Sequence, residues 1–198
     1  MIEGFRLHPA YFDPSTQQRL AVAVLEAASA APFYRPVTPG GQAMSVEMTN
    51  FGPLGWVTGP AGYRYEAHHP VTDQAWPPIP RPLLAMWAEL APDASPPDSC
   101  LVNLYRSGAR MGMHQDRDEA DFTQPVISVS LGDTALFRIG GVERRAPTRS
   151  MRLASGDVCV LAGEARLAFH GIDRILAGSS RVVPGGGRVN LTLRRAGL

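Results

Sequence analysis

Short apolar runs, separated by glycine, proline and aspartate, dominate the second half of the chain. Runs of this length predict buried β-strands, and Gly, Pro and Asp mark the turns between them. Many short strands in succession favour two sheets packed face to face, which is the jelly-roll or double-stranded β-helix arrangement. The runs cover residues 100–105, 126–131, 134–139, 150–153, 157–162, 166–169 and 188–194.

The first half of the chain carries helical patterns instead. Leu20 and Val24 lie on one apolar side of a segment that begins Pro-Ser-Thr, which predicts a helix over residues 14–30. A second helix is expected over residues 82–90. The fold class is therefore α+β but mainly β, with N-terminal helices ahead of a jelly-roll catalytic core at 100–198.

Two further segments have weaker patterns. Residues 1–13 are expected to form a loose or docking N-terminus. Residues 32–80 are rich in Gly, Pro, Tyr and Trp, which favours a lid of hairpins and loops and not an independent domain. A chain of 198 residues is long enough for a sizeable core, so we expect residues 1–198 to form a single domain.

Composition narrows the function classes only slightly. The chain is 44% hydrophobic and 19% charged, as in ordinary globular proteins, and its formal charge is +1. All 19 basic residues are arginine, so binding to nucleic acid would need a local patch. Without a signal peptide or long apolar span, we expect a cytoplasmic protein that does not contact a membrane. Cys100 and Cys159 lie in apolar runs and are expected to be buried thiols.

A candidate metal site is formed by His114 and Asp116, in the sequence His114-Gln115-Asp116, together with the distant His170. In an extended segment the side chains of His114 and Asp116 point the same way, so both can grip one ion. Two imidazoles and one carboxylate make the facial triad of Fe(II) oxygenases, which leaves positions open for a cosubstrate and O₂. Zinc accepts the same ligands, so the pattern alone leaves the metal open.

The segment 188–194 carries two arginines that could bind an anion beside this metal site. Alternation places Arg188, Asn190, Thr192 and Arg194 on one face of a predicted strand. Two inward guanidiniums are costly unless they meet anions, and Arg gives bidentate recognition of carboxylates. A dicarboxylate such as 2-oxoglutarate would satisfy both, whereas an edge strand with solvated arginines is the plainer interpretation.

At these residues the chain resembles the AlkB family, the Fe(II)/2-oxoglutarate dioxygenases that remove alkyl groups from nucleic-acid bases. The similarity extends from about Pro32 to Arg195. The matching segments are PFYRPVTPGG (32–41), MSVEMTNFGPLGW (44–56), GYRYEAHHP (62–70), NLYRSGARMGMHQDRDE (103–119), SVSLG (128–132), GDVCVLAGEARLAFHGI (156–172) and RVNLTLRR (188–195).

The resemblance implies that the triad holds Fe(II) and that 2-oxoglutarate binds beside it. It implies that Arg194 pairs with the distal carboxylate, while Arg188 lies near the metal-chelating end and can also bond Asp116. Read alone, Asn103 would be a strand-end hydrogen bonder and Tyr105 a core aromatic. The positions matched to further cosubstrate contacts are Asn103, Tyr105 and Asn190.

A second set of residues is matched to the alkylated base. Trp56 is expected to stack on a flipped base, with His114 on its other side. Asp118 is expected to accept from the exocyclic amine of the base, and Glu119 to add to the negative pocket, although both could form a solvated acidic turn. The remaining matches are Tyr63, Tyr65 and Arg144, expected to contact the nucleic acid.

The resemblance implies direct-reversal repair of 1-methyladenine- and 3-methylcytosine-type damage in DNA. We expect single strands to be preferred, and we expect a monomer because the arrangement leaves no obvious apolar stripe. RNA or tRNA demethylation by the same mechanism and a catalytically silent nucleic-acid reader are the alternatives. One departure is Leu161, which stands where the bacterial prototype of the family has an indole near the iron.

Overall fold

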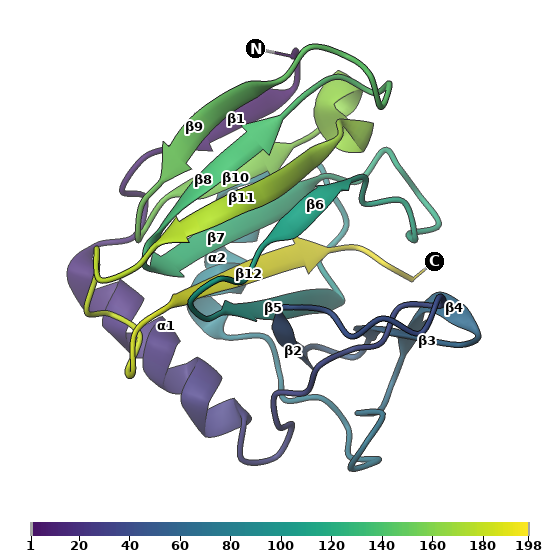
Figure 1. Ribbon diagram of the computed structural model, residues 1–198, viewed down its shortest axis with the longest axis vertical. Helices are drawn as coiled ribbons and strands as arrows, with labels where there is room; N and C mark the ends of the chain where they lie inside the picture. The colour runs from purple at the N-terminus through teal and green to yellow at the C-terminus, as the bar shows by residue number, and fades with distance from the viewer. Residues whose placement is uncertain (1, 198) are drawn as a thin grey trace.

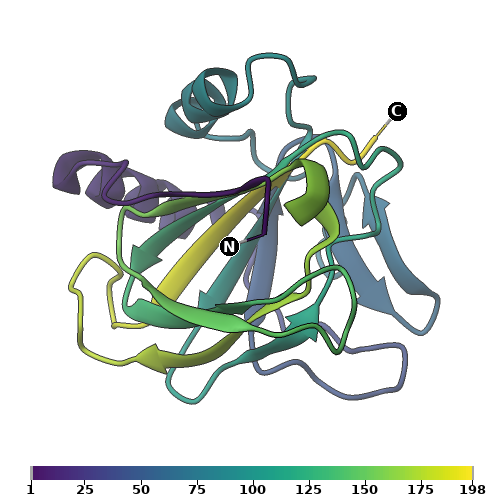
Figure 2. The ribbon, with the colours of Figure 1, turned by 90° about the horizontal axis from the view of Figure 1, so that it is seen from above.

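The computed structural model describes residues 2–197, in which two antiparallel sheets face each other and two helices lie outside the larger one (Figures 1 and 2). This is the predicted jelly roll. The larger sheet has the strand order β1-β10-β7-β12-β5-β2 and the smaller one β6-β11-β8-β9. A separate two-stranded hairpin, β3–β4, stands beside them.

The bounds of the strands follow the apolar runs closely. The larger sheet contains β1 (Phe5–His8), β2 (Glu47–Phe51), β5 (Ser99–Tyr105), β7 (Val126–Gly132), β10 (Val158–Leu161) and β12 (Arg188–Arg194). The smaller sheet contains β6 (Met111–His114), β8 (Thr134–Ile139), β9 (Arg149–Leu153) and β11 (His170–Leu176), and the hairpin contains β3 (Gly55–Gly59) and β4 (Gly62–Glu66).

The helices α1 (Pro14–Ala27) and α2 (Arg81–Leu90) cover the outer face of the larger sheet. The Asp13 carboxylate caps α1 by accepting from the Thr16 N–H at 2.9 Å, and proline occupies the first turn, where its missing N–H costs nothing. Because one face packs on helices and the other on the second sheet, β5 and β12 are buried along their whole length.

A second core fills the space between the sheets. Phe137 of β8 stacks on Phe5 of the larger sheet, with ring centres 6.1 Å apart, and Ile139 and Leu161 belong to the same buried cluster. Along β8 buried and half-buried residues alternate, because the outer face of the smaller sheet has no covering layer. One side of the inter-sheet space thus stays open at the strand ends, where the candidate ligands lie.

Several expectations were wrong in detail. Helix α1 ends at Ala27, three residues before the predicted end, because the following residues tighten into turns. Of the two expectations for the N-terminal segment, docking is confirmed, because β1 pairs with β10. Residues 163–167 form a 3₁₀ helix, η1 (Gly163–Leu167), where a strand was predicted over 166–169. Within 32–80, β2 pairs with β5 in the larger sheet.

No helix within residues 2–197 is long and apolar enough to span a membrane. Both cysteines, Cys100 and Cys159, are free and buried, as predicted. Burial raises the pKa of each thiol to about 12, so both sulfurs are protonated at neutral pH.

Candidate active site

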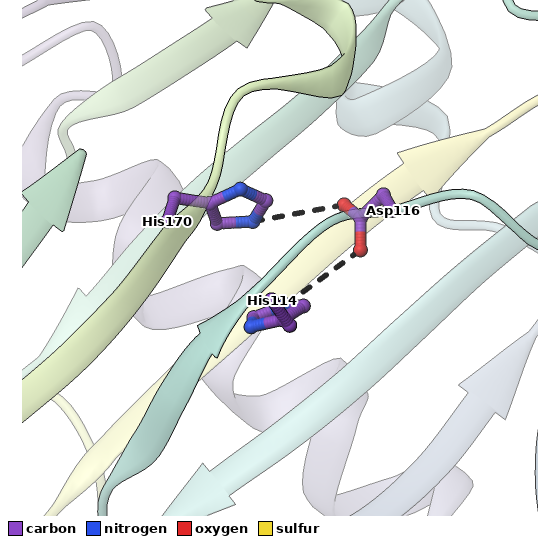
Figure 3. Close-up of side chains that lie close together, drawn as sticks. All are labelled: His114, Asp116 and His170. Carbon is purple, nitrogen blue, oxygen red and sulfur yellow. Dashed lines mark ion pairs between the residues drawn. The ribbon is translucent and has the colours of Figure 1, made fainter. Parts of the chain in front are cut away.

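The three predicted metal ligands meet at one end of the smaller sheet (Figure 3). His114 ends β6, His170 begins β11, and the two residues are direct partners in the strand register. Nε2 of His114 lies 3.7 Å from Oδ1 of Asp116, and Nε2 of His170 lies 3.8 Å from Oδ2. All three potential ligand atoms lie within 4.8 Å of one another, so one ion can reach them together.

The other ring nitrogens orient both imidazoles. Nδ1 of His114 lies 2.9 Å from the Gly112 carbonyl oxygen, and Nδ1 of His170 lies 3.0 Å from that of Ala168. Because a carbonyl only accepts, each Nδ1 carries the proton. Each Nε2 lone pair is therefore directed at the shared centre, which is the arrangement that metal-binding histidines need.

Gly171 allows the two histidine strands to approach. A Cβ at Gly171 would lie 2.7 Å from the carbonyl oxygen of Met111 and 2.9 Å from that of Gly112. Both contacts are with backbone, so a side chain here would push β11 away from β6. The glycine thus permits the pairing that brings His170 opposite His114.

The protonation states suit metal binding. Burial alone would raise the pKa of Asp116, but Arg194 and the two histidines hold this pKa well below its usual range. Burial and the neighbouring His114 lower the pKa of His170 to about 4. At neutral pH the site therefore offers an ionised carboxylate and a neutral imidazole at position 170.

A cavity of about 610 Å³ extends from these ligands into the space between the sheets. The predicted polar face of β12 lines it, while Val189, Leu191 and Leu193 pack in the outer core. Across the strand register, Asn190 lies opposite Asn103. The cavity residues expected to contact the cosubstrate are Asn103, Tyr105, Arg188, Asn190 and Arg194, and all of them are buried.

Arg194 has its counter-ions inside the protein. Its Nη2 lies 2.8 Å from Oδ1 of Asp116, and its Nε lies 3.2 Å from Oε1 of Glu119. It was Arg188 that we expected to bond Asp116, and this expectation was wrong. The alternation of β12 predicted the face of both arginines but not which end of the strand reaches the metal.

Arg188 has no carboxylate partner among the described residues. Its Nη2 donates to the Ser130 hydroxyl at 3.0 Å, and its guanidinium lies 5.2 Å from the ring centre of Tyr105. Only 1% of the residue is exposed. Burial lowers the pKa of this arginine, which shows how poorly its charge is compensated.

The hairpin β3–β4 provides an aromatic wall at the cavity mouth. The rings of Trp56 and Tyr63 stack, with their centres 5.4 Å apart and their planes at 17°. Trp56 Nε1 donates to Oδ2 of Asp118 at 2.8 Å. These three residues and His114 line the same cavity, so the structure brings the predicted stacking residue and the predicted base-reading carboxylate together.

Tyr65 and Glu119 are engaged with each other. The Tyr65 hydroxyl donates to Oε1 of Glu119 at 2.5 Å, and Glu119 is buried. This differs from the expectation that Tyr65 reaches a phosphate and Glu119 the base, because each group already has a partner within the protein. Arg144 is exposed at the mouth, where its guanidinium lies 5.1 Å from the ring centre of Phe169.

Comparisons with known proteins agree with this geometry. Residues 4–194 match the model of the 2OG-Fe(II) oxygenase superfamily. The chain is 61% identical over 196 residues to the "Alpha-ketoglutarate-dependent dioxygenase AlkB homolog" of Caulobacter vibrioides, covering 99% of this chain and 89% of the relative. The chain belongs to the AlkB family of Fe(II)- and 2-oxoglutarate-dependent dioxygenases.

Two further similarities support the family assignment. Over 176 residues the chain is 44% identical to AlkB of Escherichia coli, covering 87% of this chain and 81% of that protein. The solved structure of OsALKBH1 superposes with a TM-score of 0.83 at 28% identity, covering 98% of this chain and 99% of the other.

The residues present fit the cofactor and cosubstrate of the AlkB family. The triad supplies the nitrogen and oxygen donors that suit Fe(II). Several buried polar atoms beside it lack a hydrogen-bond partner among residues 2–197, and most are cationic donors that suit a dicarboxylate. They are Nε and Nη1 of Arg188, Nε and Nη1 of Arg194, and Oδ1 of Asn103.

Two residues near the AlkB-family triad were missed in the sequence. Arg166 of η1 is 2% exposed and bonds the loop that carries Asp116. Gln115, between two ligands, donates from Nε2 to the Leu167 carbonyl oxygen at 2.6 Å. In the sequence, Arg166 is a single arginine among small and apolar residues before His170. Such a residue looks like an ordinary surface arginine, so nothing indicated its role.

Proposed function

We propose that this protein oxidatively removes alkyl groups from N-alkylated bases in DNA, of the 1-methyladenine and 3-methylcytosine type. The reaction is direct-reversal repair of alkylation damage. One observation carries the proposal: the triad of His114, Asp116 and His170 shares a single cavity with Trp56 and Asp118. A base held by these two residues would present its alkyl group to the metal ligands.

Fe(II) with 2-oxoglutarate and O₂ would supply the oxidising chemistry. 2-Oxoglutarate would lose CO₂ and become succinate with one oxygen atom of O₂, and the other oxygen atom would hydroxylate the alkyl carbon. The bond from this carbon to the base nitrogen would then break, which releases an aldehyde and the restored base. The protein contributes position. His114 and His170 offer neutral Nε2 donors, and Asp116 offers an ionised carboxylate. The surrounding apolar residues between the sheets exclude water from the cavity floor.

We assign the distal carboxylate of 2-oxoglutarate to Arg188. This guanidinium is buried, lacks an internal counter-ion among the described residues and keeps Nε and Nη1 unpaired. Arg194, already paired with Asp116, is left to hold the end nearer the metal. Asn103, Tyr105 and Asn190 border the space between the two arginines.

Two side chains, the Trp56 ring and the Asp118 carboxylate, are proposed to bind the base in different ways. Trp56 offers a stacking face, which does not discriminate between bases. Asp118 is exposed beside it and offers a negative acceptor to the exocyclic amine of a cationic alkylated adenine or cytosine. Arg144, exposed at the mouth, is placed to meet a phosphate.

The cavity accepts only a base that has left the stack, and a single-stranded base is the cheapest to unstack. We therefore propose that single-stranded DNA is preferred and that the hairpin β3–β4, within residues 32–80, acts as the nucleotide-recognition lid. We also propose a monomer, since the exposed large apolar side chains are spread over several elements.

The deciding experiment is turnover on matched oligonucleotides. The purified protein, with Fe(II), 2-oxoglutarate and O₂, is given one 1-methyladenine in DNA and in RNA of the same sequence, in single and double strands. We expect the fastest repair in single-stranded DNA. Faster turnover on RNA would favour an RNA demethylase, and binding without turnover would favour a silent reader.

A further inference from the structure

Arg166 is the most completely bonded cation near the metal ligands. Its Nη1 donates to the Asp116 carbonyl oxygen at 2.7 Å, and its Nε donates to that of Gln124 at 2.7 Å. Its Nη2 lies 3.0 Å from Oε2 of Glu119. One buried side chain thus holds the loop between β6 and β7 at its beginning, its middle and its end.

Glu119 extends this attachment to two other elements. Its carboxylate receives Arg166 from η1, Arg194 from β12 and the Tyr65 hydroxyl from β4. Arg194 and Tyr65 share the same oxygen, Oε1. Since Arg194 also holds Asp116, the hairpin that carries the stacking rings is joined through Glu119 to a metal ligand.

The charges within this cluster balance. Asp116 and Glu119 are the carboxylates, Arg166 and Arg194 are the guanidiniums, and all four residues are buried. A buried carboxylate without its partner is expensive, so each of the two acids depends on the guanidiniums that contact it. The cluster therefore keeps Asp116 charged while its position is fixed from two sides, by Arg194 at the side chain and by Arg166 at the backbone.

We propose that Arg166 and Glu119 are positioning residues for the metal ligand Asp116. Neither contacts the ion; Arg166 holds the loop so that the Asp116 carboxylate faces both histidines, and Glu119 transmits this order to the hairpin. Groups that orient a ligand in this way typically contribute 10- to 100-fold in metal affinity. The inference does not depend on the identity of the nucleic acid.

The test is the affinity for Mn(II), followed as free Mn(II) by electron paramagnetic resonance, without O₂ or nucleic acid. We expect Arg166→Gln to weaken Mn(II) binding by about 10- to 100-fold. Arg166→Lys keeps the charge but cannot reach three acceptors at once. Compared with Arg166→Gln, it should therefore restore the melting temperature more fully than it restores Mn(II) affinity. Amides of residues 115–125 should exchange hydrogen faster in both variants.

Two controls separate positioning from general stability. Val24→Ala removes buried methyl groups in α1, away from the loop, and lowers the melting temperature without changing Mn(II) affinity. Arg81→Gln makes the same chemical change at an exposed arginine of α2, which does not line the cavity, and should leave Mn(II) affinity at the wild-type value.

A double variant guards against misfolding. Arg166→Gln with Glu119→Gln leaves no uncompensated charge between the two positions, and it should fold while binding Mn(II) as weakly as Arg166→Gln. Wild-type affinity in either variant would overturn the proposal. An equal loss in Val24→Ala would overturn it too, because the effect would then follow stability and not position.

Discussion

The two ends of β12 present the same residue in opposite surroundings. Arg194 and Arg188 lie on one face of the strand, and both are almost completely buried. Arg194 meets Asp116 and Glu119, whereas Arg188 meets a serine hydroxyl and the face of a tyrosine ring. One guanidinium is neutralised by the fold, and the other is not.

The difference shows which charge belongs to the structure and which awaits a ligand. A buried cation without a counter-ion costs free energy, and it persists in a folded protein when an external anion compensates it. Arg194 is therefore paired with the candidate metal ligand Asp116, and we propose that Arg188 pairs with the cosubstrate. Asp116→Ala, Arg194→Met and Arg188→Met each break or sharpen this contrast.

The largest effect should follow the loss of Asp116, the carboxylate that pairs with Arg194. Asp116→Ala removes a metal ligand and the main counter-ion of Arg194 together. We expect Mn(II) binding and 2-oxoglutarate decarboxylation to fall below detection while the far-ultraviolet circular dichroism is kept. Turnover retained in the purified variant would remove Asp116 from the ligand set.

Arg194→Met should destabilise the fold. It leaves two buried carboxylates short of a partner, and removing one member of a buried pair typically costs about 3–5 kcal/mol. Urea unfolding of the metal-free protein measures the loss. The matched control is Arg188→Met, which removes an unpaired cation and should lower the unfolding free energy by no more than about 1 kcal/mol, the contribution of its bond to Ser130. Equal losses in the two variants would show that both arginines are structural.

The two arginine variants should rank in the opposite order when 2-oxoglutarate binding is measured, with Arg188→Met the more damaging. Arg188→Met leaves a carboxylate of the cosubstrate unpaired in a buried site, which costs roughly 2–5 kcal/mol and weakens apparent affinity by about 30-fold or more. Calorimetric titration with Mn(II) present gives the value. Unchanged affinity would return the distal carboxylate to Arg194, as the sequence alone suggested.

The smallest effect concerns the base. Asp118→Ala should lower kcat/KM for 1-methyladenine and 3-methylcytosine by roughly 10- to 150-fold, the contribution of a charged hydrogen bond of about 1.5–3 kcal/mol. Bases with a carbonyl at that position, such as 1-methylguanine, should lose much less. Trp56→Ala should instead weaken all bases alike.

Because Asp118 also accepts from the Trp56 indole, Asp118→Asn is the informative control. It keeps an acceptor for the indole and loses the charge. If both Asp118 variants slow every base equally, the residue orients Trp56 and does not read the base.

Much of this site could be predicted from short-range pattern. The alternation of 188–194 placed four polar side chains in the cavity, and the His-Gln-Asp spacing with a distant histidine placed the triad. These features depend on the period of a strand, which a sequence displays directly. How far each arginine of β12 lies from the metal ligands depends on the register with the partner strands. The sequence does not show this register, so it could not predict which arginine contacts Asp116.

The loop network depended on contacts between distant elements. Tyr65, Glu119 and Arg166 come from three parts of the chain. Their side chains contact one another and Arg194, and Arg166 also donates to two backbone carbonyls of the loop. Each one alone resembles a polar surface residue, which is why Glu119 and Tyr65 were taken for substrate contacts. Likewise, the segment after Leu161 was apolar enough for a strand, but the Ala162 carbonyl accepts from the Ala165 N–H and begins a 3₁₀ turn instead.

Gly171 shows how a residue without a functional group can be as intolerant of mutation as a catalytic one. Its hydrogen atom sets the clearance between β11 and two carbonyl oxygens of β6, so even a methyl group would widen the gap that the two imidazoles must span. A survey of inactivating substitutions sorted by side-chain chemistry would overlook position 171. A survey sorted by interstrand clearance would rank it beside His114 and His170.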